Sequence, residues 1–151
     1  MEILTTLENT YVGFENGAFA THTETISAHA APGQVLVKAV YTTCNPYDHH
    51  MHDAMQVEGY RLGCEGCGTI VSVGEGVDPS LLNQKMAFNS RGTWAQYLSF
   101  DAKTGYLIFL EDGTDLRMAA AACVNPLTAV GQLDTILLCQ IISCLSKFDR
   151  V

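Results

Sequence analysis

The chain has 151 residues, of which 48% are hydrophobic and 16% are charged, and its formal net charge is −8. The length fits a single domain, and the composition is that of a folded chain rather than a disordered one. The acidic balance argues against nucleic acid and against an anionic membrane surface, because both attract basic faces.

The N-terminus and the cysteines indicate a cytoplasmic protein. The first residues are acidic, with no basic segment before an apolar core, so we expect no signal peptide. The six cysteines are interpreted as reduced thiols, since nothing else in the sequence indicates secretion. The apolar run 136–145 is too short to span a bilayer, and we expect no membrane segment.

Short β-strands separated by turns are predicted for most of the first 124 residues. The strands cover residues 35–41, 69–73, 85–88, 93–98 and 106–110. A Pro32-Gly33 turn precedes the first strand, and a Glu111-Asp112-Gly113 turn follows the last. Many short strands joined in this way predict a small barrel or sandwich.

A glycine-rich stretch, residues 61–77, surrounds the second of these strands. Gly63, Gly66 and Gly68 crowd one end of the strand, and a Gly74-Glu75-Gly76 turn closes the other. We expect the backbone at the three crowded glycines to bend sharply or to approach another part of the chain closely.

The chain becomes helical in character from Asp115 onward. Residues 115–123 contain four alanines, and alanine has the highest intrinsic helix propensity. Pro126 suits the first position of a second helix, with Asn125 as its cap. The apolar pattern of residues 128–145 is compatible with a continuation of that helix.

Three motifs occur in a familiar order: Asn45-Pro46-Tyr47-Asp48, the glycine-rich stretch 61–77, and Asn125-Pro126-Leu127-Thr128-Ala129. Together they resemble the medium-chain dehydrogenase/reductase superfamily, in its zinc-independent quinone oxidoreductase and enoyl reductase branch. The resemblance implies a mainly β fold, in which residues 1–124 form a GroES-like, partly open β-barrel that is the catalytic domain. Residues 125–151 are then a linking helix together with the remnant of a truncated Rossmann domain.

The resemblance implies that Asn45, Tyr47 and Asp48 are catalytic residues for a small carbonyl or quinone substrate. An amide can hold a carbonyl oxygen while a hydride reaches the electron-poor β-carbon. Asp48 is expected to orient the local backbone or Tyr47. The alternative for Asn45 is a turn residue without chemistry. Tyr47 and Tyr60 are both candidate proton donors, although packing is the preferred explanation for each.

The cofactor implied by the resemblance is NADPH. Asn125 and Thr128 are expected to bind its nicotinamide end, with the threonine hydroxyl facing the ring, while simple helix capping is the alternative for Asn125. The sequence contains no Gly-x-Gly-x-x-Gly loop for the pyrophosphate. We therefore expect these 151 residues alone to bind NADPH poorly and to be inactive. We also expect them to form a homo-oligomer or to pair with a missing Rossmann half.

Zinc is the competing cofactor. In zinc-dependent members of the superfamily a cysteine and a histidine of this domain hold the metal, and the resemblance puts Asn45 and Cys64 at their places. Cys64 and Cys67 have CxxC spacing, with histidines nearby at 49, 50 and 52, so a zinc site stays open as an alternative. The preferred interpretation is that both cysteines are small buried residues, that the histidines are exposed loop residues, and that no zinc binds.

Two functions from different classes remain at this stage. The first is the catalytic part of an NAD(P)H-dependent reductase of quinones or α,β-unsaturated carbonyl compounds. The second is a non-catalytic GroES-like module that has lost its cofactor domain and serves as a structural or binding piece.

Overall fold

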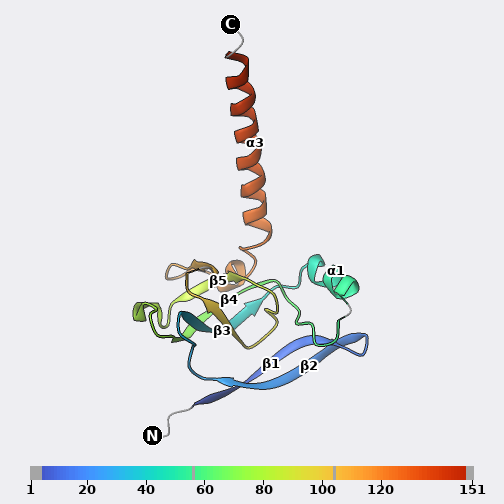
Figure 1. Cartoon of the computed structure of the whole chain (residues 1–151), viewed down its shortest axis with the longest axis vertical. Coiled ribbons are helices and arrows are strands. Elements are labelled where there is room, and N and C mark those ends of the chain that lie inside the picture. The colour runs from blue at the N-terminus through green and yellow to red at the C-terminus, as the bar shows by residue number, and fades with distance from the viewer. Residues whose placement is uncertain (1–4, 56, 104, 149–151) are drawn as a thin grey trace.

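The computed structural model describes residues 5–55, 57–103 and 105–148. These residues form a mainly β body, from which one long helix rises (Figure 1). The strands are β1 (Thr6–Glu15), β2 (Ala18–Ser27), β3 (Gln34–Thr42), β4 (Glu65–Val73), β5 (Lys85–Asn89), β6 (Tyr97–Asp101) and β7 (Tyr106–Phe109). The helices are α1 (Pro46–Met55), the short 3₁₀ helix η1 (Pro79–Leu81), α2 (Leu116–Ala119) and α3 (Asn125–Phe148).

Five strands form one antiparallel sheet in the order β6-β3-β4-β5-β7. The glycine-rich strand β4 lies at its centre, between β3 and β5. Pairing of β3 with β4 is interrupted by two register shifts, the first between Leu36 and Val37 and the second between Ala39 and Tyr41. Such irregularities bend a strand, as closure toward a barrel requires. The expected mainly β architecture, followed by C-terminal helix, is therefore confirmed.

The remaining two strands, β1 and β2, form a separate hairpin to which the sequence analysis assigned no element. Asn16 and Gly17 make its turn, with φ of 50° and 79°. Positive φ at both central residues gives the turn a twist that matches the flanking strands. Isolated bridges from Tyr11 to Ala95 and from Gly13 to Arg61 join the hairpin to the rest of the body.

The glycines of β4 allow its close approach to β3. A Cβ atom on Gly68 would lie 2.4 Å from the Lys38 carbonyl oxygen, and one on Gly66 would lie 2.7 Å from that of Tyr41. Both distances are far below contact, so neither position tolerates a side chain without movement of the backbone. The close approach predicted from the sequence is confirmed.

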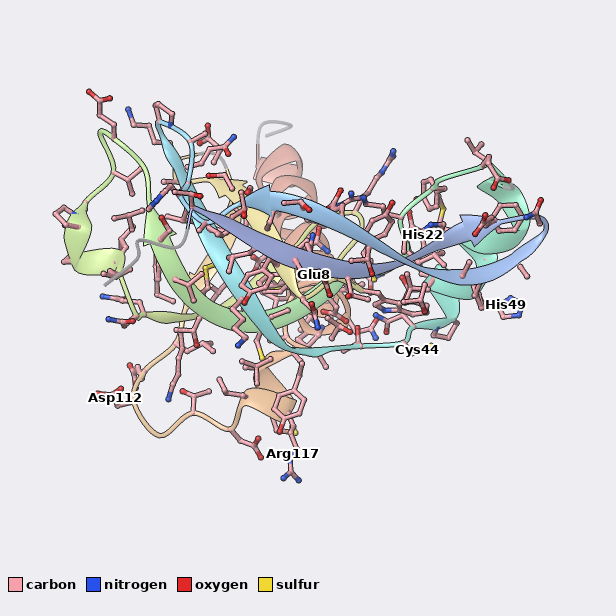
Figure 2. All side chains as sticks on the ribbon, turned by 90° about the horizontal axis from the view of Figure 1, so that it is seen from below. Glu8, His22, Cys44, His49, Asp112 and Arg117 are labelled. Carbon is pink, nitrogen blue, oxygen red and sulfur yellow. The ribbon has the colours of Figure 1, made fainter. Side chains whose placement is uncertain are left out.

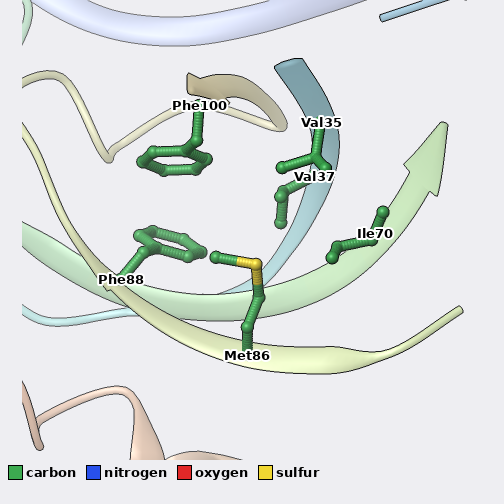
Figure 3. Close-up of a cluster of buried hydrophobic side chains, with 6 residues drawn as sticks. All are labelled: Val35, Val37, Ile70, Met86, Phe88 and Phe100. Carbon is green, nitrogen blue, oxygen red and sulfur yellow. The ribbon is translucent and has the colours of Figure 1, made fainter. Parts of the chain in front are cut away.

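The main hydrophobic core lies inside the curved sheet (Figure 3). Its fully packed side chains come from β3, β4, β5 and β6 and are Val35, Val37, Ile70, Met86, Phe88 and Phe100. The rings of Phe88 and Phe100 meet with centroids 5.1 Å apart, at an interplanar angle of 38°. A second, smaller cluster joins β4 and β5 to the alanine-rich segment and consists of Cys67, Ala87, Ala119, Ala120 and Cys123.

Three predictions of local structure were wrong. The strand expected at 93–98 is β6, at 97–101, because Trp94 and Gln96 donate their backbone N–H groups to Leu62 and Thr10 instead. Residues 46–55 form helix α1 where a turn and loop were expected. The helix expected at 115–123 is only α2, four residues long, with the Asp115 side chain accepting from the Arg117 N–H at its start.

None of the helices in the described part of the chain combines the length and the apolar character needed to cross a bilayer.

Candidate active site

The buried carboxylate of Glu65 lies at the centre of the candidate site. Glu65 is the first residue of β4 and is completely inaccessible to solvent. Its Oε2 accepts hydrogen bonds from the backbone N–H groups of Cys123, at 3.1 Å, and Val124, at 2.8 Å. Its Oε1 accepts from the side chains of Asn45 and Thr43. Four donors surround one carboxylate, which is how a buried charge is satisfied.

Glu65 thereby connects two distant parts of the sequence. Asn45 precedes α1, and Val124 immediately precedes α3, yet both lie within one hydrogen bond of the same carboxylate. Glu65 was not among the site residues predicted from the sequence. The available signal was a charged residue inside a strand of glycine and apolar residues, since a glutamate is rarely buried unless it is paired.

The Asn45 amide group is tightly held. Its Nδ2 atom lies 2.9 Å from Glu65 Oε1, 2.9 Å from Thr43 Oγ1 and 3.4 Å from Cys64 Sγ. Thr43 in turn is fixed by the indole of Trp94, whose Nε1 donates to the Thr43 carbonyl oxygen at 2.7 Å. Asn45 is thus part of a side-chain network, and a turn-forming role alone does not account for it.

Asp48 fixes the start of helix α1. Its side chain is buried, and its Oδ2 accepts from the Asn45 backbone N–H at 2.8 Å, while the Asp48 N–H donates to the Asn45 carbonyl. The Asp48 carboxylate thus forms one half of a capping box, because it accepts from the N–H of the residue before the helix, while the Asn45 side chain is used elsewhere. Pro46 occupies the first helical position, which suits it. Asp48 therefore orients the local backbone, one of the two roles expected from the sequence.

The two candidate tyrosines lie in different environments. Tyr47, in the first turn of α1, is 52% exposed, so packing does not explain it. Tyr60 is half-buried, and its carbonyl accepts from the Phe14 N–H, which ties its segment to β1. Packing remains an adequate explanation for Tyr60 but not for Tyr47.

The start of α3 borders a hollow of about 460 Å³ on the barrel. The hollow is lined by β5 and β7 on one side and by α3 on the other, with Asn89, Leu107, Ile108, Val124, Leu127 and Thr128 among its residues. Thr128 donates its hydroxyl to the Val124 carbonyl at 2.7 Å, so its oxygen offers only acceptor capacity to a ligand. Asn125 is exposed and is the first helical residue; the residue before it, Val124, receives the first helical hydrogen bond.

A second hollow, of about 450 Å³, adjoins the residues before Asn45. Tyr11, Tyr41, Thr43, Cys44 and Trp94 line it, together with neighbouring backbone. Figure 2 shows Cys44 and His49 on the side of the molecule that carries α1. Each hollow thus borders one end of the Glu65 network, one near Thr43 and the other at Val124.

Burial keeps the nearby thiols protonated. It raises the pKa of Cys64 to about 11, with the neighbouring Asp48 and Glu65 carboxylates adding to the effect against the opposing hydrogen bond from Asn45. Burial also raises the pKa of Cys123 to about 11, again with Glu65 contributing. The described residues contain no group of three or more His, Cys, Asp or Glu side chains suited to a metal ion.

The fold and the site define a class: a mainly β domain whose central strand buries a carboxylate beside the start of a long helix. The chain belongs to the alcohol dehydrogenase GroES-like domain family, whose model matches residues 31–109, and thus to the medium-chain dehydrogenase/reductase superfamily of oxidoreductases.

Three relatives illustrate the membership. The trans-enoyl reductase mycC of Thermothelomyces thermophilus is 32% identical over 113 residues, covering 66% of this chain and 30% of its own length. A candidate NADPH:quinone reductase of Mesorhizobium loti is 28% identical with a TM-score of 0.65, covering 91% of this chain and 46% of its own. A similar protein of Bacillus thuringiensis, at 23% identity and a TM-score of 0.70 over 82% and 39% of the two chains, shares the fold. The chain thus spans less than half the length of each of these proteins.

Proposed function

We propose that this chain supplies the substrate-binding part of an NADPH-dependent oxidoreductase that reduces quinones or α,β-unsaturated carbonyl compounds. The observation that carries the proposal is the Glu65 carboxylate, which holds Asn45 and the backbone before α3 together. The names of two relatives, a trans-enoyl reductase and a candidate NADPH:quinone reductase, support the choice of substrate class.

In this proposal, Asn45, Tyr47 and Thr128 surround the reacting groups. Bound reduced nicotinamide supplies the hydride for the electron-poor β-carbon. The hydroxyl of Tyr47, which is exposed on the first turn of α1, donates a proton or hydrogen bond to the substrate oxygen. The apolar side chains of Leu127 and Ile108 in the hollow beside α3 exclude water from the ring.

The residues present fit the nicotinamide end of the cofactor and not its phosphates. Thr128 and the half-buried Asn45 offer polar atoms for a ring carboxamide or ribose. The 151 residues contain no Gly-x-Gly-x-x-Gly loop to receive a pyrophosphate. We therefore expect weak NADPH binding and no turnover by these residues alone, with a dinucleotide-binding partner segment completing the enzyme.

The test is ¹H–¹⁵N NMR with cyclohex-2-enone as the substrate probe. A Cys44→Ser background avoids addition of the enone to the exposed thiol. We expect saturable shift changes at Asn45, Tyr47 and Thr128, and their loss in Asn45→Ala. Changes confined to residues remote from Asn45 and α3, or none at millimolar probe, would favour a non-catalytic module instead.

A further inference from the structure

The orientation of the Asn45 amide decides what the site can recognise. An amide side chain has a donor group, Nδ2, and an acceptor group, Oδ1, which diverge from the same planar carbon. Which end faces a ligand therefore determines whether a carbonyl oxygen or an N–H or O–H group is bound there.

Glu65 fixes this orientation. A carboxylate can only accept hydrogen bonds, and Glu65 Oε1 lies 2.9 Å from the inner atom of the Asn45 amide. That inner atom must therefore be the nitrogen. Its remaining capacity is directed to Thr43 Oγ1 and to the Cys64 thiol, so both amide protons point into the protein.

The outward-facing atom is consequently the oxygen. Among the hydrogen bonds of the described residues, none has Asn45 Oδ1 as its acceptor. This oxygen is also not one of the buried side-chain atoms that lack a hydrogen-bond partner. Since an Oδ1 without a partner would be among those atoms if it were buried, this oxygen is accessible to solvent. It can accept a hydrogen bond from a ligand but cannot donate one.

We infer that Glu65 is a positioning residue that makes Asn45 an acceptor, so that the site selects a ligand group carrying an N–H or O–H at this point. The inference rests on the proposed function for the identity of the ligand. It changes the role expected from the sequence, in which the amide held a carbonyl oxygen. The substrate carbonyl then needs another donor, and we assign this role to the exposed Tyr47, two residues along the chain from Asn45.

Two sources can supply such a donor: a hydroxyl on the substrate, or the carboxamide of the nicotinamide ring. Matched probes distinguish them. Cyclohexanol and cyclohexanone differ in donor capacity on the substrate side, and nicotinamide and 3-acetylpyridine differ in the same way on the cofactor side.

The first experiment needs no ligand. In wild type, NMR should show both Asn45 side-chain amide protons protected from exchange, with nuclear Overhauser effects to Thr43. In Glu65→Gln the oxygen of the new amide can still accept from the Cys123 and Val124 N–H groups, and its nitrogen then faces Asn45 as a donor. The Asn45 amide should therefore rotate, so that Oδ1 faces residue 65 and Nδ2 faces outward. The Asn45 protons should then lose protection and the contact with Thr43. Retained protection in a folded Glu65→Gln protein would overturn the inference.

The second experiment measures dissociation constants for the four probes by NMR titration. In wild type the donor member of at least one pair should bind about two- to tenfold more tightly, the range expected for one hydrogen bond. This preference for the donor probe should shrink or reverse in Glu65→Gln and vanish in Asn45→Ala. The Asn45→Ala variant provides the test if Glu65→Gln does not fold. Equal binding within both pairs in wild type overturns the inference and leaves the proposed function standing. Absence of all probe binding overturns both.

Discussion

Asn45 and Glu65 are 20 positions apart in the sequence, yet Asn45 Nδ2 lies 2.9 Å from Glu65 Oε1 in the folded chain. The same carboxylate receives the backbone N–H groups of Cys123 and Val124. One buried acidic side chain therefore sets both the orientation of a candidate substrate-binding amide and the position at which α3 leaves the barrel.

Removing this carboxylate should strongly destabilise the chain. Glu65→Ala leaves the N–H groups of Cys123 and Val124 and the Asn45 amide without their acceptor, and we expect a loss of about 2–4 kcal/mol in the free energy of unfolding. Glu65→Gln retains an acceptor and should lose less. Urea denaturation measures the free energy of unfolding of both variants. Glu8→Ala, at an exposed position of β1, is the control, and its free energy of unfolding should lie within about 0.5 kcal/mol of wild type. Equal losses for Ala and Gln would show that the acceptor is unimportant.

The cysteines should differ sharply in reactivity. Cys44 is exposed, whereas burial raises the pKa of both Cys64 and Cys123 to about 11. At pH 8 few molecules carry either buried thiolate, and only the thiolate reacts. Iodoacetamide followed by peptide mass spectrometry should label Cys44 much faster than Cys64 or Cys123. Rapid labelling of Cys64 in the folded protein would contradict the structure of the site.

The ion pair between Glu24 and Arg61 should give a pH-dependent contribution to stability. Burial raises the pKa of Glu24, but hydrogen bonds from Arg61 and Asn9 and the charge of Arg61 outweigh it, so the pKa is lowered. A carboxyl with a lowered folded-state pKa stabilises the fold above its unfolded value, here 4.5, and the contribution is lost as the pH falls through the folded pKa.

Glu24→Gln should therefore lower stability by about 1 kcal/mol or less at pH 7, since the pair is partly exposed. The difference from wild type should disappear in acid, once the pH is below the lowered folded-state pKa of Glu24. Thermal denaturation at several pH values provides the measurement, and Glu8→Gln provides a matched carboxylate without this ion pair. A stability difference that persists undiminished in acid would contradict a role for the Glu24 charge.

Helix α3 should drive self-association. It rises away from the barrel (Figure 1) and exposes a series of apolar side chains, which are Leu127, Val130, Leu133, Ile136, Leu137 and Leu138. Such a surface is costly in water and is typical of an interface. Sedimentation velocity should show concentration-dependent oligomers that weaken in Leu133→Lys/Leu137→Lys. Leu82→Lys, at an exposed leucine remote from α3, should leave them unchanged.

The sequence predicted those parts of the fold that depend on local patterns. The five strands of the main sheet and the helix containing Pro126 follow from alternation, turns and propensity, although β6 is displaced because Trp94 and Gln96 bond to other segments. The hairpin of β1 and β2 was missed although Asn16-Gly17 is a strong turn signal.

The candidate site was predictable only in part. Asn45 and Thr128 could be located by motif, but the contact that joins their segments could not, because it passes through Glu65 and depends on tertiary structure. The direction of the Asn45 amide was likewise beyond the sequence, since it follows from the acceptor beside Nδ2. A motif identifies the residue, whereas its hydrogen-bond partners determine whether it donates or accepts.

The central claim is that the segments of Asn45 and Thr128 form one site for the nicotinamide ring and the substrate. The most direct measurement is a set of intermolecular nuclear Overhauser effects between reduced nicotinamide mononucleotide, at millimolar concentration, and isotope-labelled protein. The account predicts contacts from the ring protons to the side chains of both Asn45 and Thr128, and their loss in Glu65→Ala if that variant is folded. Ring contacts to only one of the two residues, or to neither, would contradict it.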